Sequence, residues 1–427
     1  MAAFGNYRLI LEDQNIDDLD LTGIDRLFFG KWFAHPIDKL NLKEIIVLEL
    51  GVDYNDSSVN HLDLKNVRKL VFGLNFNKSI NQLDLKNVRH LQFGYNYDRP
   101  VQELDLKNVE TLIFGGGFNQ SFLGFDLKNV TNFTFGGKYL THSLAELDLK
   151  NVTHLTFGFE FNENIDCLDL KSVTHLTIDG MFNQSLDNVD LKCVTHLTID
   201  GLFNQPINRL NLQNVTHLIL GQYFNQSIDE VDFKNVESLK FGYNFDRPID
   251  GVDFKKIKHL KFGFNFNRSI NNVDFKNVES LTLGHSFDQF VDGVDLKKIK
   301  YLKFGFSFNR PITNVDFKDV RHISFGELFC EGIDASVSTG RDIVVPENYH
   351  YHRSRLLREQ ISEKKLTKTQ SLAYNDECPV CCDKVELILS CLHGYCQECL
   401  LRCLDAEIYF CGMCRHHLLS GQIEMFN

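Results

Sequence analysis

The chain has 427 residues and a formal net charge of −12. Its 7 prolines and a hydrophobic fraction of 43% argue against a disordered chain, and no window reaches the roughly 18 apolar residues that a membrane-spanning helix needs. The negative charge opposes attraction to phosphate backbones. We therefore expect neither a nucleic acid nor a membrane as the partner.

No basic segment followed by an apolar one stands at residues 1–11, so a secretory signal is not expected. Nine of the 12 cysteines fall between residues 378 and 414. Cysteines at two-residue gaps in a reducing compartment indicate metal binding rather than disulfides. We expect a cytoplasmic or nuclear location with reduced thiols.

A repeat runs from residue 1 to about residue 334, marked by the apolar residue that ends phrases such as LDLKNV. The spacing is about 21 residues, as from Val173 to Val194 and on to Val215, and two of the steps are one position longer. A unit of this length cannot bury its own apolar face, which predicts an elongated β-solenoid of about fifteen stacked coils. The aligned residues are Ile24, Ile45, Val67, Val88, Val109, Val130, Val152, Val173, Val194, Val215, Val236, Ile257, Val278, Ile299 and Val320.

Each coil contains two short phrases in which apolar residues alternate, and alternation is typical of strands. Two parallel ladders are therefore expected. A glycine usually follows the first phrase, and we expect it to need a positive φ. Examples are Gly73, Gly94, Gly158, Gly242 and Gly305, with Asp179 and Asp200 taking this place in two coils.

An aromatic residue stands nine positions after each aligned residue, from Phe33 to Phe329, and predicts a stacked internal spine. The next residue is usually asparagine, as at Asn162, Asn183 and Asn204. Its amide is expected to satisfy turn backbone groups of the neighbouring coil.

Phrases such as Phe182-Asn183-Gln184-Ser185 and Phe203-Asn204-Gln205-Pro206-Ile207 resemble the FNIP repeat, a relative of the leucine-rich repeat. The resemblance covers about three quarters of the chain. It implies a leucine-rich-repeat-like solenoid that binds a protein, in a family that often adds a ubiquitin-pathway module.

Three columns of polar residues lie on the expected surface. Aspartates such as Asp148 and Asp169 precede lysines by two positions, which indicates a solvated, locally paired face, or else a docking face for a basic partner. A histidine column that includes His154 and His175 is interpreted as surface repetition. The residue between the two inward positions changes from threonine (Thr156, Thr177, Thr198) to lysine (Lys240, Lys261, Lys303), and we expect a protein substrate to bind there.

The predicted organisation has four parts: a repeat solenoid at 1–334, a cap and basic, partly helical linker at 335–371, a zinc module at 372–420 and a tail at 421–427. The linker is expected to be a short, weakly docked helix or a flexible tether.

Eight zinc-ligand side chains mark the last part. Sets of four thiolate or imidazole ligands suit tetrahedral Zn²⁺, so two ions are expected, and a region this short should depend on them to fold. The ligands are Cys378, Cys381, Cys391, His393, Cys396, Cys399, Cys411 and Cys414. Sequence spacing leaves open whether they pair sequentially or in an interleaved order.

These spacings resemble the RING finger over residues 378–415, a small α+β zinc domain. The resemblance implies interleaved ligation, with Cys378, Cys381, Cys396 and Cys399 on one zinc and Cys391, His393, Cys411 and Cys414 on the other. It also implies that Val380 contacts a ubiquitin-conjugating enzyme and that Arg415 contacts ubiquitin. An E3 ubiquitin ligase without a covalent intermediate would follow.

Two positions depart from that pattern. Cys403 stands where a tryptophan is common, and Gly412 stands where a proline is common. These departures keep a second hypothesis open, in which the zinc module serves assembly in a non-catalytic protein-interaction scaffold. A third, nucleic-acid binding by zinc fingers, is disfavoured by the acidic charge.

Overall fold

The computed structural model describes residues 8–12, 16, 19–137, 142–312, 315–333, 337, 340–347, 349, 353–355, 357, 361, 368–369, 377–389, 393–406, 413 and 424–426. The chain divides into two compact units, residues 1–226 and 227–427. Both are mainly β. Among the described residues, no helix is long and apolar enough to cross a membrane.

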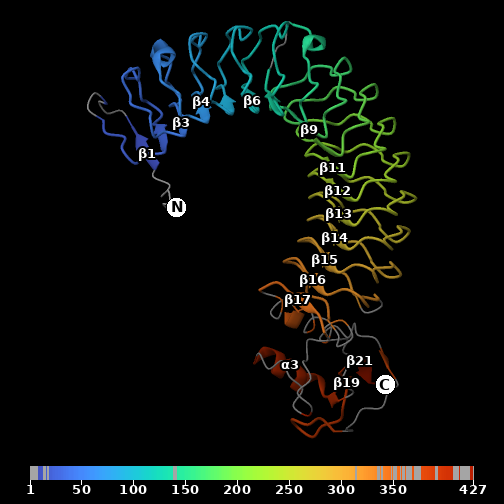
Figure 1. Ribbon diagram of the computed structural model, residues 1–427. Helices are drawn as coiled ribbons and strands as arrows, with labels where there is room; N and C mark the ends of the chain where they lie inside the picture. Colours follow the sequence, from blue (N-terminus) through green and yellow to red (C-terminus); the bar gives the residue numbers. More distant parts are fainter. Residues whose placement is uncertain are drawn as a thin grey trace. The chain divides into compact units, whose positions relative to one another are not determined.

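The first unit is a stack of coils in which one short strand of each coil pairs in parallel with the strand of the next (Figure 1). The strands are β1 (Arg8–Leu11), β2 (Arg26–Phe29), β3 (Val47–Glu49), β4 (Lys69–Val71), β5 (His90–Gln92), β6 (Thr111–Phe114), β7 (Asn132–Phe135), β8 (His154–Phe157), β9 (His175–Ile178), β10 (His196–Ile199) and β11 (His217–Leu220).

The second unit contains a similar parallel ladder and then a small module. The ladder strands are β12 (Ser238–Phe241), β13 (His259–Lys261), β14 (Ser280–Thr282), β15 (Tyr301–Lys303), β16 (His322–Ser324) and β17 (Asp342–Val344). The module contains β18 (Lys368–Thr369), β19 (Leu387–Ile388), β20 (Gly394–Tyr395), α3 (Gln397–Asp405) and β21 (Glu424–Phe426). Its strands form a four-stranded sheet in the order β18-β21-β19-β20.

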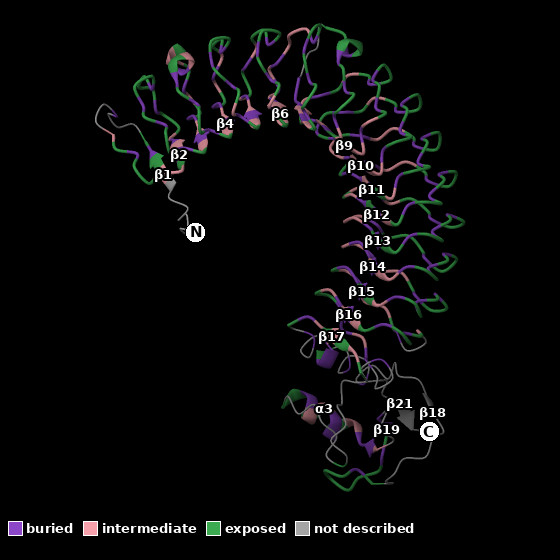
Figure 2. Cartoon of the chain, viewed as in Figure 1, coloured by how far each residue is buried: buried purple, intermediate pink, exposed green. Residues whose placement is uncertain are grey.

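The strands form where apolar residues alternate, as the sequence predicts. In β9, Leu176 and Ile178 are buried while His175 and Thr177 are half-buried. The aromatic spine packs behind this face, and the rings of Phe161 and Phe182 stack with their centroids 6.1 Å apart. Burial of one such side chain is worth about 1.5–3 kcal/mol. The buried residues that form the core of each coil lie between its strand and its outer turns (Figure 2).

The asparagine that follows the spine residue joins neighbouring coils. Asn162 Oδ1 accepts a hydrogen bond from the backbone N–H of Asn183 at 2.8 Å, and Asn183 Oδ1 accepts one from Asn204 at 2.9 Å. The prediction that this amide satisfies backbone groups of the next coil is confirmed.

Two 3₁₀ helices absorb the two longer steps of the repeat. Strand pairing advances by the regular step at β9–β10 (Leu176↔Leu197), but by one position more at β3–β4 (Leu48↔Leu70) and β7–β8 (Phe133↔Leu155). The segment between β3 and β4 contains η1 (Ser57–His61), and the segment between β7 and β8 contains η2 (Leu144–Glu146). The extra residue is thus taken up in the outer turn, and the inward residues keep their register.

The second apolar phrase of each coil is not a strand in the described residues, so the expectation of two ladders is wrong. Its backbone closes a turn instead: the N–H of Val173 donates to the carbonyl of Leu170 at 2.9 Å. The carboxylate of Asp169 accepts the N–H of Lys171 at 3.2 Å. Because these groups bond locally, the phrase buries its apolar side chains without pairing between coils.

The glycine that follows the strand is required for close approach, not for a positive φ as expected. A Cβ on Gly73 would lie 1.7 Å from the carbonyl oxygen of Gly51, and one on Gly305 would lie 1.7 Å from that of Gly284. Positive φ occurs instead at Gly180, one position after Asp179, whose side chain accepts the N–H of that glycine at 2.6 Å.

The ladder of the second unit ends one coil beyond the last aligned residue. Strand β17 pairs with β16 after a step that is one position shorter than the regular one (Ile323↔Ile343). An alignment with a fixed repeat length therefore does not find this strand. The ring of Tyr349 stacks on Phe329 at 5.9 Å and its hydroxyl donates to the carbonyl of Glu331 at 2.8 Å. Tyr349 therefore closes the aromatic spine.

Candidate metal centre

A tight turn presents the first two thiols. Residues Glu377 and Lys384 form an antiparallel bridge, and the N–H of Cys378 donates to the carbonyl of Asp383 at 2.7 Å. The N–H of Cys382 donates to the carbonyl of Cys378 at 2.9 Å, and Cys382 has a φ of 62°. The turn directs Cys378 inward, where it is buried, and leaves Cys381 exposed.

The N-terminus of α3 presents the second pair. Cys396 caps the helix, and its Sγ accepts a hydrogen bond from the N–H of Cys399 at 3.4 Å. The carboxylate of Glu386 accepts the N–H of Gln397 at 2.7 Å, which satisfies another free amide of the first turn. The antiparallel pair of β19 and β20 leads the chain into this cap.

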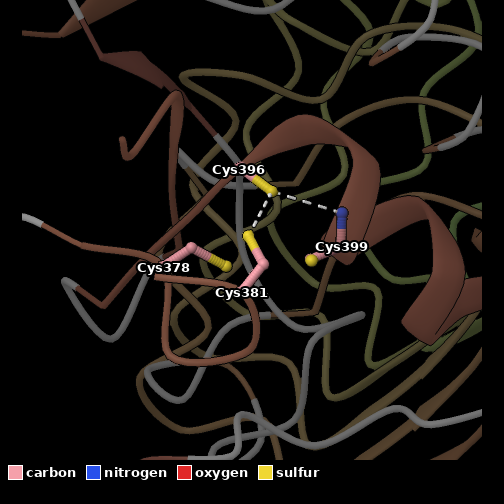
Figure 3. A group of neighbouring side chains, drawn as sticks. All are labelled: Cys378, Cys381, Cys396 and Cys399. Atoms are coloured by element: carbon pink, nitrogen blue, oxygen red, sulfur yellow. Dashed lines mark hydrogen bonds between the residues drawn. The ribbon is translucent and has the colours of Figure 1, made fainter. Parts of the chain in front are cut away.

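The four sulfur atoms converge, although their two pairs lie on different elements (Figure 3). All four Sγ atoms lie within 4.8 Å of one another, and those of Cys381 and Cys396 are 3.5 Å apart. A tetrahedral ion with metal–sulfur bonds of about 2.3 Å requires sulfur atoms about 3.8 Å apart. The set therefore fits a single metal ion, and four thiolates suit a soft or borderline one.

The thiols differ in their tendency to ionise. Burial opposes ionisation of Cys378, but hydrogen bonds from backbone N–H groups, that of Cys396 first, outweigh it and lower the pKa of this thiol to about 7. Burial raises the pKa of Cys399 to about 11. A bound cation would favour the thiolate form of both groups, since the anion is the ligand.

A small apolar core supports the cluster. Cys378, Cys396 and Cys399 pack in one hydrophobic cluster whose other buried members are Leu357, Ile361, Leu387, Leu389, Tyr395, Leu400 and Leu404. Leu357 and Ile361 belong to the expected linker, so this segment contributes to the core of the module. The four-residue spacing of these two apolar residues is the sequence signal for their shared helical face.

Some predicted site residues can be placed and others cannot. Val380 is 60% exposed in the turn between Cys378 and Cys381, and His393 precedes β20. Cys403 lies on α3, half-buried against the hydrophobic cluster. Outside the described residues lie Cys391, Cys411, Gly412, Cys414 and Arg415.

The repeat surface is built as a regular array. The carboxylate of Asp169 also pairs with the Lys171 ammonium at 3.0 Å, as expected for a locally paired face. Hydrogen bonds from the side chain and then the backbone of Lys171 hold the pKa of Asp169 below its usual value. The sheet face carries Thr177, half-exposed, in the first unit and Lys240 and Lys261, exposed, in the second.

Comparison with known proteins concerns the repeat region. The model of the family DUF285, described as a Mycoplasma protein of unknown function, matches residues 134–247 and 203–284. The match does not extend to the cysteine cluster, and the FNIP and RING resemblances stay predictions. No curated protein matches the chain.

Two solved structures are similar to the chain. CroV588, described as a novel circular LRR protein structure, matches with a TM-score of 0.61 and 26% identity over 78% of this chain and 54% of CroV588, so the chain spans about half the length of that protein. The internalin InlF from Listeria monocytogenes str. 4b F2365 matches with a TM-score of 0.40 and 15% identity over 69% of this chain and 85% of that one. The chain is thus mainly a leucine-rich-repeat-like β-solenoid of about fifteen coils, followed by a cysteine cluster compatible with a small zinc module.

Proposed function

We propose that this chain is a RING-type E3 ubiquitin-protein ligase. In this proposal the solenoid binds a protein substrate, and the C-terminal module binds a ubiquitin-conjugating enzyme that carries ubiquitin. The observation that carries it is the convergence of Cys378 and Cys381 with Cys396 and Cys399, which passes over Cys391 and His393. That order is the interleaved one that the resemblance to the RING finger implies.

The bound ions in this proposal are two Zn²⁺, the second held by Cys391, His393, Cys411 and Cys414. Zinc would hold the turn of Cys378 against the N-terminus of α3 and so fix the position of Val380. The chain's own residues bind and orient the partners, and no residue of the module forms a bond to ubiquitin. The regular, exposed sheet face of the solenoid supports its role as a protein-interaction surface.

Val380 offers a direct test. Val380→Arg places a charge on a side chain that is 60% exposed and that is not part of the hydrophobic cluster, so zinc binding and folding should persist. Purified protein with activating enzyme, conjugating enzymes, ubiquitin and ATP should form ubiquitin chains, and the variant should lose at least about tenfold in rate, as expected for a central contact in an interface.

The matched control is Leu123→Arg, which changes an apolar side chain 69% exposed in the first unit and should keep the wild-type rate. Metal content is measured in every sample. Failure of the zinc-loaded wild-type protein to form chains with a broad panel of conjugating enzymes would refute the proposal.

A second function is favoured by Cys403, which lies on α3, half-buried against the hydrophobic cluster, where a larger aromatic residue is common in the resembling family. In that case the module assembles the protein with a partner and transfers nothing. A cellular effect that persists in Val380→Arg and Arg415→Ala but is lost on removal of the metal ligands would support this scaffold.

A further inference from the structure

A basic cavity lies where four neighbouring coils of the second unit lead into their strands. Its volume is about 600 Å³, and residues before β14, β15, β16 and β17 line it. Six of the lining residues are cationic, namely Lys276, Lys298, Lys300, Lys318, Arg321 and Arg341, against the two carboxylates of Glu279 and Asp319. This local excess of positive charge contrasts with the net charge of −12 of the chain.

The excess arises because a pattern of paired charges ends here. In the surface column formed by the residue directly before each strand, Glu237 pairs with Lys258 at 2.8 Å, and Glu279 pairs with Lys300 at 2.6 Å. The next members of that column are Arg321 and Arg341, so no acid follows. Among the described residues, the side chains of Lys298, Lys318 and Arg321 form no ion pair.

Arg341 contributes a fixed charge at the end of the cavity. Its guanidinium donates to the carbonyls of Phe317 at 3.0 Å, Val320 at 3.0 Å and Val337 at 2.9 Å. These carbonyls hold the guanidinium in place. A ligand in the cavity would meet the charged side chains of Lys298, Lys318 and Arg321 directly.

A smaller cavity in the first unit carries a balanced charge. It has a volume of about 240 Å³ and lies beside the corresponding turns. Its charged lining residues are balanced, with Asp126 and Asp148 against Lys128 and Lys150. Lys150 there already pairs with Asp148 at 2.9 Å.

We propose that the cavity of Lys298, Lys318 and Arg321 binds a phosphoryl group, the dianion of a phosphate monoester. Three cations without an ion pair, against the one remaining carboxylate of Asp319, match a dianion with several acceptor oxygens better than a single carboxylate, and arginine binds phosphate through two parallel hydrogen bonds. The group can belong to a phosphorylated protein or to a small phosphate compound. This binding depends neither on the metal centre nor on ligase activity.

The test is calorimetric titration of the full-length protein at an ionic strength of about 0.1 M with two phosphate monoester probes, free O-phosphoserine and a short phosphoserine peptide. Saturable binding at one site per chain is expected. The triple variant Lys298→Gln/Lys318→Gln/Arg321→Gln should weaken it about tenfold or more. Binding should also weaken below about pH 6, where the phosphoryl group of the peptide takes up a proton.

The matched control is Lys39→Gln/Lys65→Gln/Arg209→Gln, which removes two lysines and one arginine of the first unit, all exposed and none lining the cavity. The affinity of this control should stay within about twofold of the wild type, because none of its residues lines the cavity and exposed charges are screened at this ionic strength. Tighter binding of the peptide identifies a protein source, and tighter binding of free O-phosphoserine a small-molecule source. No saturable binding of either probe, an equal loss in the control, or equally tight binding of a glutamate peptide would overturn the proposal.

Discussion

The glycine after each strand sets how closely two coils approach. Gly305 and Gly284 are consecutive members of this column, and the carbonyl of one occupies the space that a side chain on the other would need. The requirement is steric and comes from the neighbouring coil. A single sequence shows that glycine recurs, but it cannot distinguish close approach from a positive φ, because glycine satisfies both.

Gly305→Ala should therefore destabilise the second unit strongly. The new Cβ would meet the backbone oxygen of Gly284 at 1.7 Å, and because backbone must move, we expect the free energy of unfolding to fall by about 3 kcal/mol. Gly293→Ala is the comparison, since Gly293 has a φ of 79° and nothing within 4 Å, and it should cost about 1 kcal/mol. Urea unfolding of both variants measures the difference, and equal losses would contradict the steric explanation.

The convergence of four thiols was expected from the sequence, but the residues that support them were not. Two-residue gaps predict Cys378, Cys381, Cys396 and Cys399 as ligands because the gap fits a turn around an ion. Their grouping depends on how the β19–β20 hairpin folds back, which spacing does not encode. Leu357 and Ile361 join the same core from outside the cysteine-rich segment, and only the three-dimensional packing shows it.

At the scale of the coil, the sequence pattern predicted the ladder formed by the first apolar phrase, because a half-buried strand buries every second residue. The same alternation in the second phrase was misleading. There, aspartate side chains such as that of Asp169 and a turn satisfy the backbone, so apolar residues alternate without a strand. Strand β17 was missed because its shorter step breaks the period.

The strands β8 to β11 also align four imidazole rings in a stack. The centroids of His154 and His175 are 4.2 Å apart, as are those of His175 and His196, and the next pair is 4.3 Å apart. The Nδ1 atom of each ring lies 2.9–3.0 Å from a threonine hydroxyl. Burial first, and then the neighbouring imidazoles, lower the pKa of His175 and of His196 below the usual value.

This stack should make the first unit less stable in mild acid. In the unfolded chain these histidines take up protons near their ordinary pKa of about 6.5, whereas the folded state resists protonation. The unfolded state therefore binds more protons as the pH falls below that value, and the free energy of unfolding decreases. The stability that the neutral histidine stack contributes is fully present above about pH 6.5 and is lost as the pH falls below that value.

Urea unfolding at about pH 7.5 and 5.5 tests this, since both values lie above the range in which carboxylates titrate. The double variant His175→Gln/His196→Gln should lose less stability between the two pH values than the wild type does. His61→Gln, which removes an exposed histidine outside the stack, should behave as the wild type. An unchanged pH dependence in the double variant would contradict the argument.

For the whole molecule, two kinds of stability are combined in one chain. A stack of coils is stabilised by contacts between neighbours, so a local defect affects nearby coils more than distant ones. The cysteine module instead has a small core, and we expect its cohesion to depend on an ion shared by the four thiols. The two parts should therefore respond differently to removal of metal.

Chelation of the metal should unfold the module and spare the repeats. Hydrogen exchange of the full-length protein should show loss of protection at residues 377–406 after treatment with a chelator, while β2 to β10 keep theirs. Cys399→Ser should reproduce this result without chelator and lower the metal content, whereas Cys382→Ser should change neither, since Cys382 lies outside the cluster of four sulfurs. A structural zinc site is worth about 10–16 kcal/mol, so its loss should be evident in the exchange. If residues 377–406 kept their protection without metal, the thiol cluster would not be the element that holds the module together.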